Sequence, residues 1–126
     1  MTRRDLLTIA AAVGIAPFEA RGDQPRGAAA ASPAALERDD GELIYVGRDP
    51  VRIKISPTRG GRLAMITQDV SAGTSIPIHA HDREDEIIFI PSGRGEATLG
   101  EQRVKLEAGS TLFVPQGTWH GGRNTA

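Results

Sequence analysis

Short apolar runs alternate with turn-forming residues along the chain from residue 41 onward. Residues 51–55 read Val-Arg-Ile-Lys-Ile, and this alternation is the period of a strand with one buried face. Residues 47–50 and 56–61, on either side, are rich in Gly and Pro, which favour turns. No run here has the 3.6-residue period of an amphipathic helix. The pattern therefore indicates an all-β domain.

Strands of four to eight residues at this spacing form an antiparallel sandwich or barrel, whose interior and mouth are natural small-ligand sites. The pattern argues against a helical enzyme, and no glycine-rich loop precedes a helix to hold a nucleotide phosphate. The expected strands lie at residues 43–46, 51–55, 62–70, 76–81, 86–90, 96–99, 104–106, 111–114 and 118–120.

The first part of the chain has a different pattern, a basic start followed by a continuous apolar run. Arg3 and Arg4 precede an apolar run at residues 6–16, which ends at Pro17. A basic start followed by a short apolar run predicts a signal peptide, because a transmembrane helix needs about 20 apolar residues. We therefore expect residues 1–31 to be a targeting segment.

The end of this segment offers small residues for cleavage, at 28–31 and less favourably at Ala20. Residues 32–40 predict a flexible linker, with at most a short helix at 33–38 that carries no function. The remaining residues, 41–126, form the expected domain. No cysteine follows the apolar run, so we expect no lipid anchor and no stable membrane attachment after cleavage.

Residues 2–7, Thr-Arg-Arg-Asp-Leu-Leu, resemble the twin-arginine export motif. Leu6 departs from the usual Phe, and Thr8 departs from the common Lys. The resemblance implies that an already folded protein is exported to the periplasm or outside a bacterial cell, with any metal loaded in the cytoplasm. An ordinary Sec signal is the alternative, because it also begins with basic residues.

The composition limits which partners and metal ligands are expected. The net charge is −1 and the sequence pI is near 6.3, so no basic field is available to bind nucleic acid. Aromatic residues make up 4% of the chain, which disfavours base-stacking surfaces. The chain has no cysteine, which excludes disulfides and thiolate ligands. Any metal must be held by imidazole and carboxylate groups.

The chain has three histidines, and all lie among these strand and turn signals. His79 and His81 are two residues apart, so on a strand they share a face at roughly 6.6 Å spacing along the strand. Glu86 follows after a polar insert at residues 82–85 that predicts a turn, and the third histidine is His120. A His-x-His pair alone is weak evidence, but three histidines and a carboxylate together predict a metal site.

Residues 73–124 resemble the cupin family, through two motifs whose intervals are all met. The first consists of a Gly, His-x-His, Glu and a second Gly, and the second consists of a Gly, Pro-x-Gly, His and Asn. In this sequence the motif positions are Gly73, His79, His81, Glu86, Gly93, Gly109, Pro115, Gly117, His120 and Asn124.

The resemblance implies a double-stranded β-helix, or jelly-roll barrel, in which His79, His81, Glu86 and His120 hold one divalent metal. Three imidazoles and one carboxylate suit Fe, Mn, Ni, Cu and Zn alike. Four protein ligands on an octahedral ion leave two adjacent positions for other oxygen ligands. The remaining motif residues would be structural, serving turns and barrel corners.

The leading hypothesis from these residues is an exported, metal-dependent oxidoreductase of the dioxygenase kind, acting on a small oxygenated molecule. Glu86 would be both a ligand and a proton acceptor. The alternatives are a non-catalytic module that binds or senses a small ligand such as a sugar or organic acid, and an inactive truncated relative. The family includes isomerases, decarboxylases and binding proteins, so the fold leaves the reaction and substrate open.

Cupin chains normally continue past the second-motif Asn, whereas this sequence stops at Ala126. We therefore expect the barrel to lack its last C-terminal strand or strands, leaving an edge near the metal unpaired. Either the chain is a fragment, which we favour, or a second subunit closes the edge in a homodimer.

Other polar and aromatic residues near the motifs have weaker predicted roles. Glu84 and Asp85 are expected in a solvated loop, and Trp119 is expected to pack against the barrel wall. Candidates for pointing into the interior are Arg62, Gln68 and Phe113.

Overall fold

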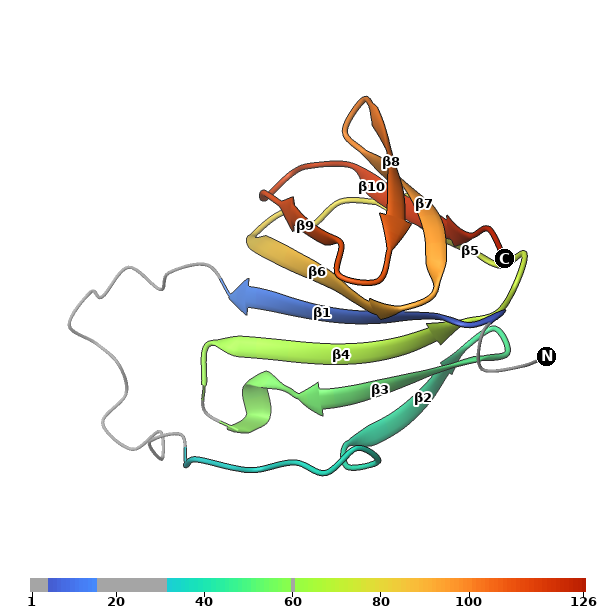
Figure 1. Ribbon diagram of the computed structural model, residues 1–126. Coiled ribbons are helices and arrows are strands. Elements are labelled where there is room, and N and C mark those ends of the chain that lie inside the picture. The colour runs from blue at the N-terminus through green and yellow to red at the C-terminus, as the bar shows by residue number, and fades with distance from the viewer. Residues whose placement is uncertain (1–4, 16–31, 60) are drawn as a thin grey trace.

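Two antiparallel sheets face each other in the computed structural model, which describes residues 5–15, 32–59 and 61–126 (Figure 1). The larger sheet has the strand order β2-β3-β4-β1-β6-β9, and the smaller has the order β5-β10-β7-β8. The strands are β1 (Leu7–Ile15), β2 (Glu42–Val46), β3 (Asp49–Ile55), β4 (Leu63–Val70), β5 (Ser75–His79), β6 (Glu84–Ser92), β7 (Arg94–Leu99), β8 (Gln102–Glu107), β9 (Thr111–Val114) and β10 (His120–Asn124).

This architecture confirms the predicted all-β class and is consistent with the cupin jelly-roll barrel. Several boundaries differ from expectation. β5 ends at His79 because the chain turns there, so His81 does not lie on the same strand as His79. β6 begins at Glu84, inside the expected turn, and β10 runs from His120 onward instead of ending there. The helix considered at residues 33–38 is absent, since residues 32–37 have no regular structure. In the described residues, no helix is long and apolar enough to cross a bilayer.

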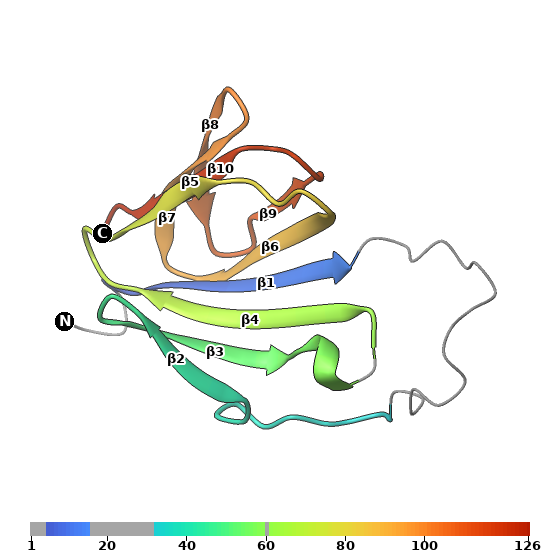
Figure 2. The ribbon, with the colours of Figure 1, turned by 180° about the vertical axis from the view of Figure 1, so that it is seen from behind.

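The apolar run expected to be the core of a signal peptide forms β1, in the middle of the larger sheet (Figure 2). It pairs antiparallel with β4 from Leu7↔Val70 to Gly14↔Leu63, and with β6 from Thr8↔Ser92 to Ile15↔Glu84. The two arginines and the expected cleavage sites lie outside the described residues. A strand with two partners contributes to the barrel, which is a role we did not predict for this segment.

Alternate residues of β1 explain its position. Leu7, Ile9 and Ala11 are 1%, 7% and 3% exposed, while Thr8 and Ala10 between them are only half-buried on the other face. This is the two-residue period of a strand with one face on the core. On that outer face the Thr8 hydroxyl donates a hydrogen bond to Asp69 Oδ1 at 3.0 Å.

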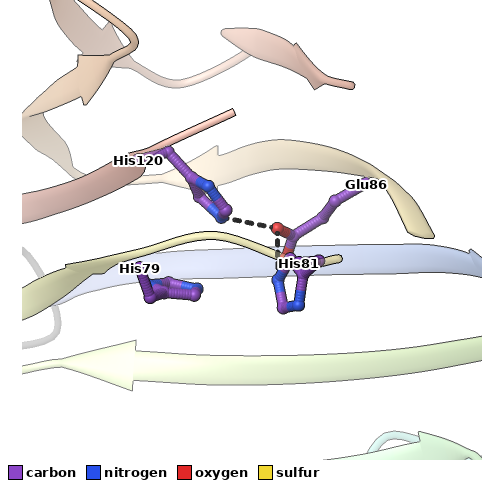
Figure 3. A group of neighbouring side chains, drawn as sticks. All are labelled: His79, His81, Glu86 and His120. Carbon is purple, nitrogen blue, oxygen red and sulfur yellow. Dashed lines mark hydrogen bonds and ion pairs between the residues drawn. The ribbon is translucent and has the colours of Figure 1, made fainter. Parts of the chain in front are cut away.

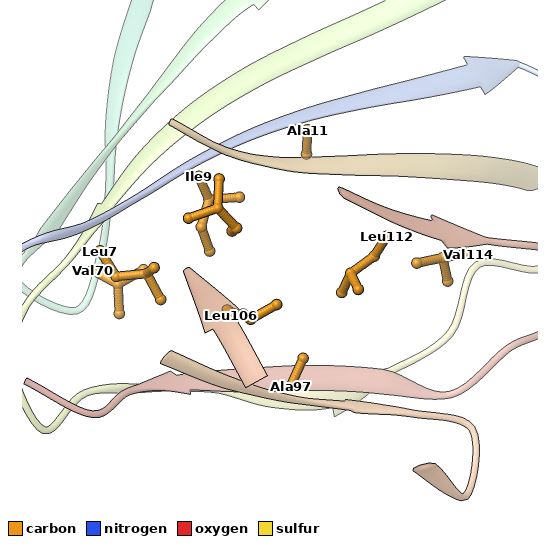
Figure 4. Packing of buried hydrophobic residues seen from close by; sticks show 9 residues of the cluster. Leu7, Ile9, Ala11, Val70, Ala97, Leu106, Leu112 and Val114 are labelled. Atoms are coloured by element: carbon orange, nitrogen blue, oxygen red, sulfur yellow. The ribbon is translucent and has the colours of Figure 1, made fainter. Parts of the chain in front are cut away.

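The core lies between the sheets and includes residues from both (Figure 4). Ile90 of β6 and Val70 of β4 are fully buried, and the smaller sheet contributes Ala97 and Leu106. Side chains from the two inner faces therefore meet as in other β-sandwich cores. The buried cluster consists of Leu7, Ile9, Ala11, Val70, Ile90, Ala97, Leu106, Leu112 and Val114.

Asn124 fastens the end of β10 to the start of β1 and the end of β4. Its Nδ2 donates to the carbonyl oxygens of Asp5 at 2.7 Å and Val70 at 2.8 Å, and its side chain is buried. Its Oδ1 accepts from the Ala126 amide at 2.8 Å. The structural role implied for Asn124 therefore includes holding β1 in place.

Gly93 lies where β1 enters the sheet. Its φ is +92°, and a Cβ built there would lie 2.7 Å from Leu7 Cα and would also collide with the Leu6 carbonyl oxygen. A side chain would therefore be strained both by the backbone conformation and by contact with β1. Glycine is therefore required at position 93 for two reasons, its positive φ and the close approach of β1.

β1 also changes the expected unpaired edge. β6, which carries Glu86, is paired with β1 and β9, and β10, which carries His120, is paired with β5 and β7. The edge strands near these residues are β5 and β9. β1 thus lies between β4 and β6, and without it each of these two strands would have one unpaired edge.

Candidate metal centre

The four predicted ligands converge on one point between the sheets (Figure 3). One ligand atom from each of His79, His81, Glu86 and His120 lies within 4.8 Å of the other three. His79 ends β5, His81 lies in the connection that follows, Glu86 is in β6, and His120 begins β10. The structure therefore brings together the whole predicted set.

Strand pairing and one loop contact hold these residues in place. His120 is the register partner of His79 across β10 and β5. The amide of Gly117 donates to the carbonyl of His81 at 2.8 Å, joining the loops of the two motifs. Gly117 has a φ of +77°, which favours glycine at this turn. The odd sequence offset between His81 and Glu86 is absorbed by the connection between β5 and β6.

Glu86 lies between two of the histidines. Its Oε2 is 2.8 Å from Nε2 of His120 and 3.2 Å from Nε2 of His81. The His79 ring completes the group, with its centroid 4.3 Å from that of His120 and 5.2 Å from that of His81. Glu86 and His120 are buried, whereas His79 and His81 are half-buried. The group therefore has a buried side and a side closer to solvent.

The outer nitrogens of the rings have partners that orient the inner ones. Nδ1 of His79 lies 2.8 Å from the Pro77 carbonyl oxygen, and Nδ1 of His120 lies 2.9 Å from that of Thr118. A carbonyl oxygen can only accept, so in a neutral ring the proton is on Nδ1 and Nε2 presents a lone pair. Metal-ligating histidines are oriented by outer partners of this kind.

This arrangement needs positive charge at its centre. A neutral His120 with its proton on Nδ1 brings the Nε2 lone pair to within 2.8 Å of a carboxylate oxygen. Nε2 of His81 is buried without a hydrogen-bond partner, although it is 3.2 Å from Glu86 Oε2. Extra protons or a cation would relieve both contacts, and a divalent cation would use all four donor groups at once. The donor set therefore fits a metal ion.

A cavity of about 370 Å³ opens beside this group. Glu86, His79 and His120 lie on its wall, together with aliphatic residues from both sheets. Its volume is within the usual range for small-molecule sites. β1 contributes Leu7, Ile9 and Ala11 to this wall, which the sequence did not reveal because the segment reads as a signal peptide.

The weaker predictions have mixed outcomes. Gln68 lines the cavity, as considered, whereas Arg62 is exposed before β4 and Phe113 is 58% exposed. Trp119 is 62% exposed, so the expected packing against the barrel wall is wrong. Its neighbour His120 faces inward, and alternation along the chain turns the Trp119 side chain outward.

Glu84 and Asp85 belong to β6 and not to a solvated loop as predicted. Oε2 of Glu84 lies 3.7 Å from Nδ1 of His81, on the outer side of that ring. Oδ1 of Asp85 accepts a hydrogen bond from the Gln116 amide at 2.9 Å. Neither is among the four residues that converge, in agreement with the sequence analysis.

Comparison with known proteins agrees with the fold. Residues 66–126 match the family model described as a cupin domain, which supports assignment of the chain to the cupin family. An uncharacterized protein of Methanocaldococcus jannaschii is 29% identical over 62 residues, covering 49% of this chain and 50% of the archaeal one. This chain therefore spans about half the length of that relative.

A second relative covers more of the chain. An uncharacterized protein of Streptomyces coelicolor is 27% identical over 86 residues, covering 68% of this chain and 79% of its own length. Neither relative carries a described activity, so function has to be argued from the site.

Proposed function

We propose that this protein binds one divalent transition metal through His79, His81, Glu86 and His120, and that it is a metal-dependent oxidoreductase of the dioxygenase kind. The substrate would be a small oxygenated molecule held in the adjoining cavity. The observation that supports the proposal is the convergence of four donor atoms at the wall of a cavity of about 370 Å³. A bound metal would supply Lewis acidity and, for a redox-active ion, electron transfer.

Glu86 has the position of a proton acceptor. Both of its histidine contacts use Oε2, and Glu86 also lies on the wall of the cavity. The carboxylate is buried at the cavity wall, and a general base has to lie within hydrogen-bond reach of the group whose proton it accepts. The buried His120 would hold Glu86 in position during this proton transfer, and the aliphatic wall would limit access of water.

Metal analysis tests the site. The full chain, purified without a metal-affinity tag, is expected to contain about one equivalent of a transition metal, and His79→Ala or His120→Ala should each remove nearly all of it. Glu107→Gln, a charge change at an exposed position on β8, is the control and should keep the metal. Stoichiometric metal in both histidine variants would overturn the assignment.

Oxygen consumption tests the reaction. Metal-loaded protein would be screened against small oxygenated molecules for substrate-dependent uptake of dioxygen, with the His120→Ala variant as the negative control. Uptake that depends on both substrate and metal supports the oxidoreductase. Saturable binding of a ligand without its conversion would instead favour the binding or sensing module.

A further inference from the structure

Away from the metal ligands most of the cavity wall is apolar, and the polar side chains on it are those of Asp49, Gln68, Thr74, Ser75 and Arg123. Ile9 of β1, Ile66 of β4 and Ile88 of β6 line one side, and Leu106 and Leu112 of the following strands line another. These residues come from five different strands, so the apolar character is a property of the interior and not of one segment. A ligand that fills the cavity moves from water into contact with this apolar surface, which favours apolar ligands.

Two charged side chains on the wall already have protein partners. The carboxylate of Asp49 is buried and accepts from both the backbone amide and the hydroxyl of Ser71. The Arg123 guanidinium lies 3.6 Å from Glu96 Oε2. A ligand carrying many hydroxyl groups would therefore bury several of them without a hydrogen-bond partner, which is unfavourable.

The size of the cavity limits the ligand. A volume of about 370 Å³ corresponds to about a dozen water molecules at their share of liquid volume. His79, Glu86 and His120 lie on the same wall, so one end of the ligand meets the metal centre while the rest contacts aliphatic side chains.

We propose that the ligand of this site is an apolar molecule of about a dozen non-hydrogen atoms, with metal-binding oxygens at one end only. The inference rests on the proposed function and narrows its substrate class. It favours short-chain or aromatic carboxylates and related oxygen donors over sugars and sugar acids.

A homologous series of carboxylates tests the inference. Binding of butanoate, hexanoate, octanoate and gluconate to the metal-loaded full chain would be measured by calorimetry. Each added methylene is expected to tighten binding about fourfold, because transfer of one buried methylene from water is favourable by that factor. Gluconate is expected to bind more weakly than octanoate. An affinity that does not change with chain length, or gluconate binding as tightly as octanoate, would overturn the inference.

Adjacent isoleucines on β6 provide a matched pair of variants. Ile88 lines the cavity and is half-buried, whereas Ile87 is 51% exposed on the opposite face. Ile88→Thr should weaken octanoate binding several-fold more than butanoate binding and keep the metal, while Ile87→Thr should leave the series unchanged. If Ile88→Thr does not fold, Ile88→Val gives a smaller change in the same direction. Equal effects of the two positions would contradict the proposal.

The metal content of the same samples separates the two proposals. A chain without bound metal whose affinity still rises with each methylene would contradict the proposed function and support the apolar ligand. A chain with one metal and no dependence on chain length would support the metal site and contradict the apolar ligand.

Discussion

Asn124 shows how much of the structure depends on one side chain. Its amide group contacts the carbonyl oxygens of Asp5 and Val70, which belong to segments far from it and from each other in the sequence. Because Asn124 is buried, its loss would remove a hydrogen-bond donor from each of these two carbonyl oxygens. The residue therefore links three strands that carry the wall of the site.

We predict that Asn124→Ala lowers the free energy of unfolding by about 1–3 kcal/mol, the usual cost of leaving a buried polar group unsatisfied. Asn124→Asp should be at least as harmful, because it places a carboxylate oxygen opposite two carbonyl oxygens. Urea denaturation measures both. Gln116→Ala, at an exposed residue, is the control and should change stability by less than about 0.5 kcal/mol. An Asn124→Ala variant as stable as the control would contradict this role.

At the scale of single elements, the site was predictable and β1 was not. The ligands were predictable because three histidines and one carboxylate fall among short strands and turns, although His81 lies in the connection after β5 and not on one strand face with His79 as expected. β1 consists of Leu-Thr-Ile-Ala-Ala-Ala-Val-Gly-Ile, and because the residues between its larger apolar side chains are mostly small, the segment also reads as the apolar run of a signal peptide. Its partners are residues 63–70 and 84–92, so no local pattern indicates the pairing.

Adjacent alanines on β1 test its structural role. Ala11 is 3% exposed and faces the core, while Ala10 is half-buried on the outer face. Ala11→Asp should destabilise the full chain by about 3 kcal/mol or more, because it buries an unpaired charge. Ala10→Asp should cost about 1 kcal/mol, the range of strand propensity.

The Ala10→Asp and Ala11→Asp variants also distinguish a structural strand from a signal peptide at residues 7–15. Both substitutions add one charge to the apolar run, so they should impair an export signal to similar extents. A large difference in stability between them, measured by thermal or urea unfolding, supports β1. Equal stability of the two variants and the wild-type chain would mean that residues 7–15 take no part in the folded protein.

At the scale of the whole molecule, export remains a proposal, and cleavage of the proposed signal segment would affect β1. Recognition and cleavage of residues 1–31 would remove a strand from the centre of the larger sheet and three residues from the cavity wall. A chain that is not cleaved retains the central strand and the three wall residues. Identifying the N-terminal residue of the mature protein therefore shows whether the functional form contains β1 or has lost it.

We predict that replacing both arginines, Arg3→Lys with Arg4→Lys, blocks export by the twin-arginine route without changing metal binding by the purified chain. Fractionation of cells with immunodetection gives the first result, and mass spectrometry of the exported protein gives its first residue. Unchanged export of the double variant would indicate the Sec route. The absence of exported protein from wild-type cells would remove export from the proposal.

The pairing of β1 has a consequence for the order of events during synthesis. β1 leaves the ribosome before either of its partner strands, and its last partner residue is Ser92. At ordinary translation rates the segment waits roughly 4 to 15 s before both neighbouring strands exist. During that interval it is an apolar, unpaired nonapeptide, open to any factor that binds such segments. The speed of elongation thus sets the time in which the same nine residues are available to other factors before the barrel encloses them.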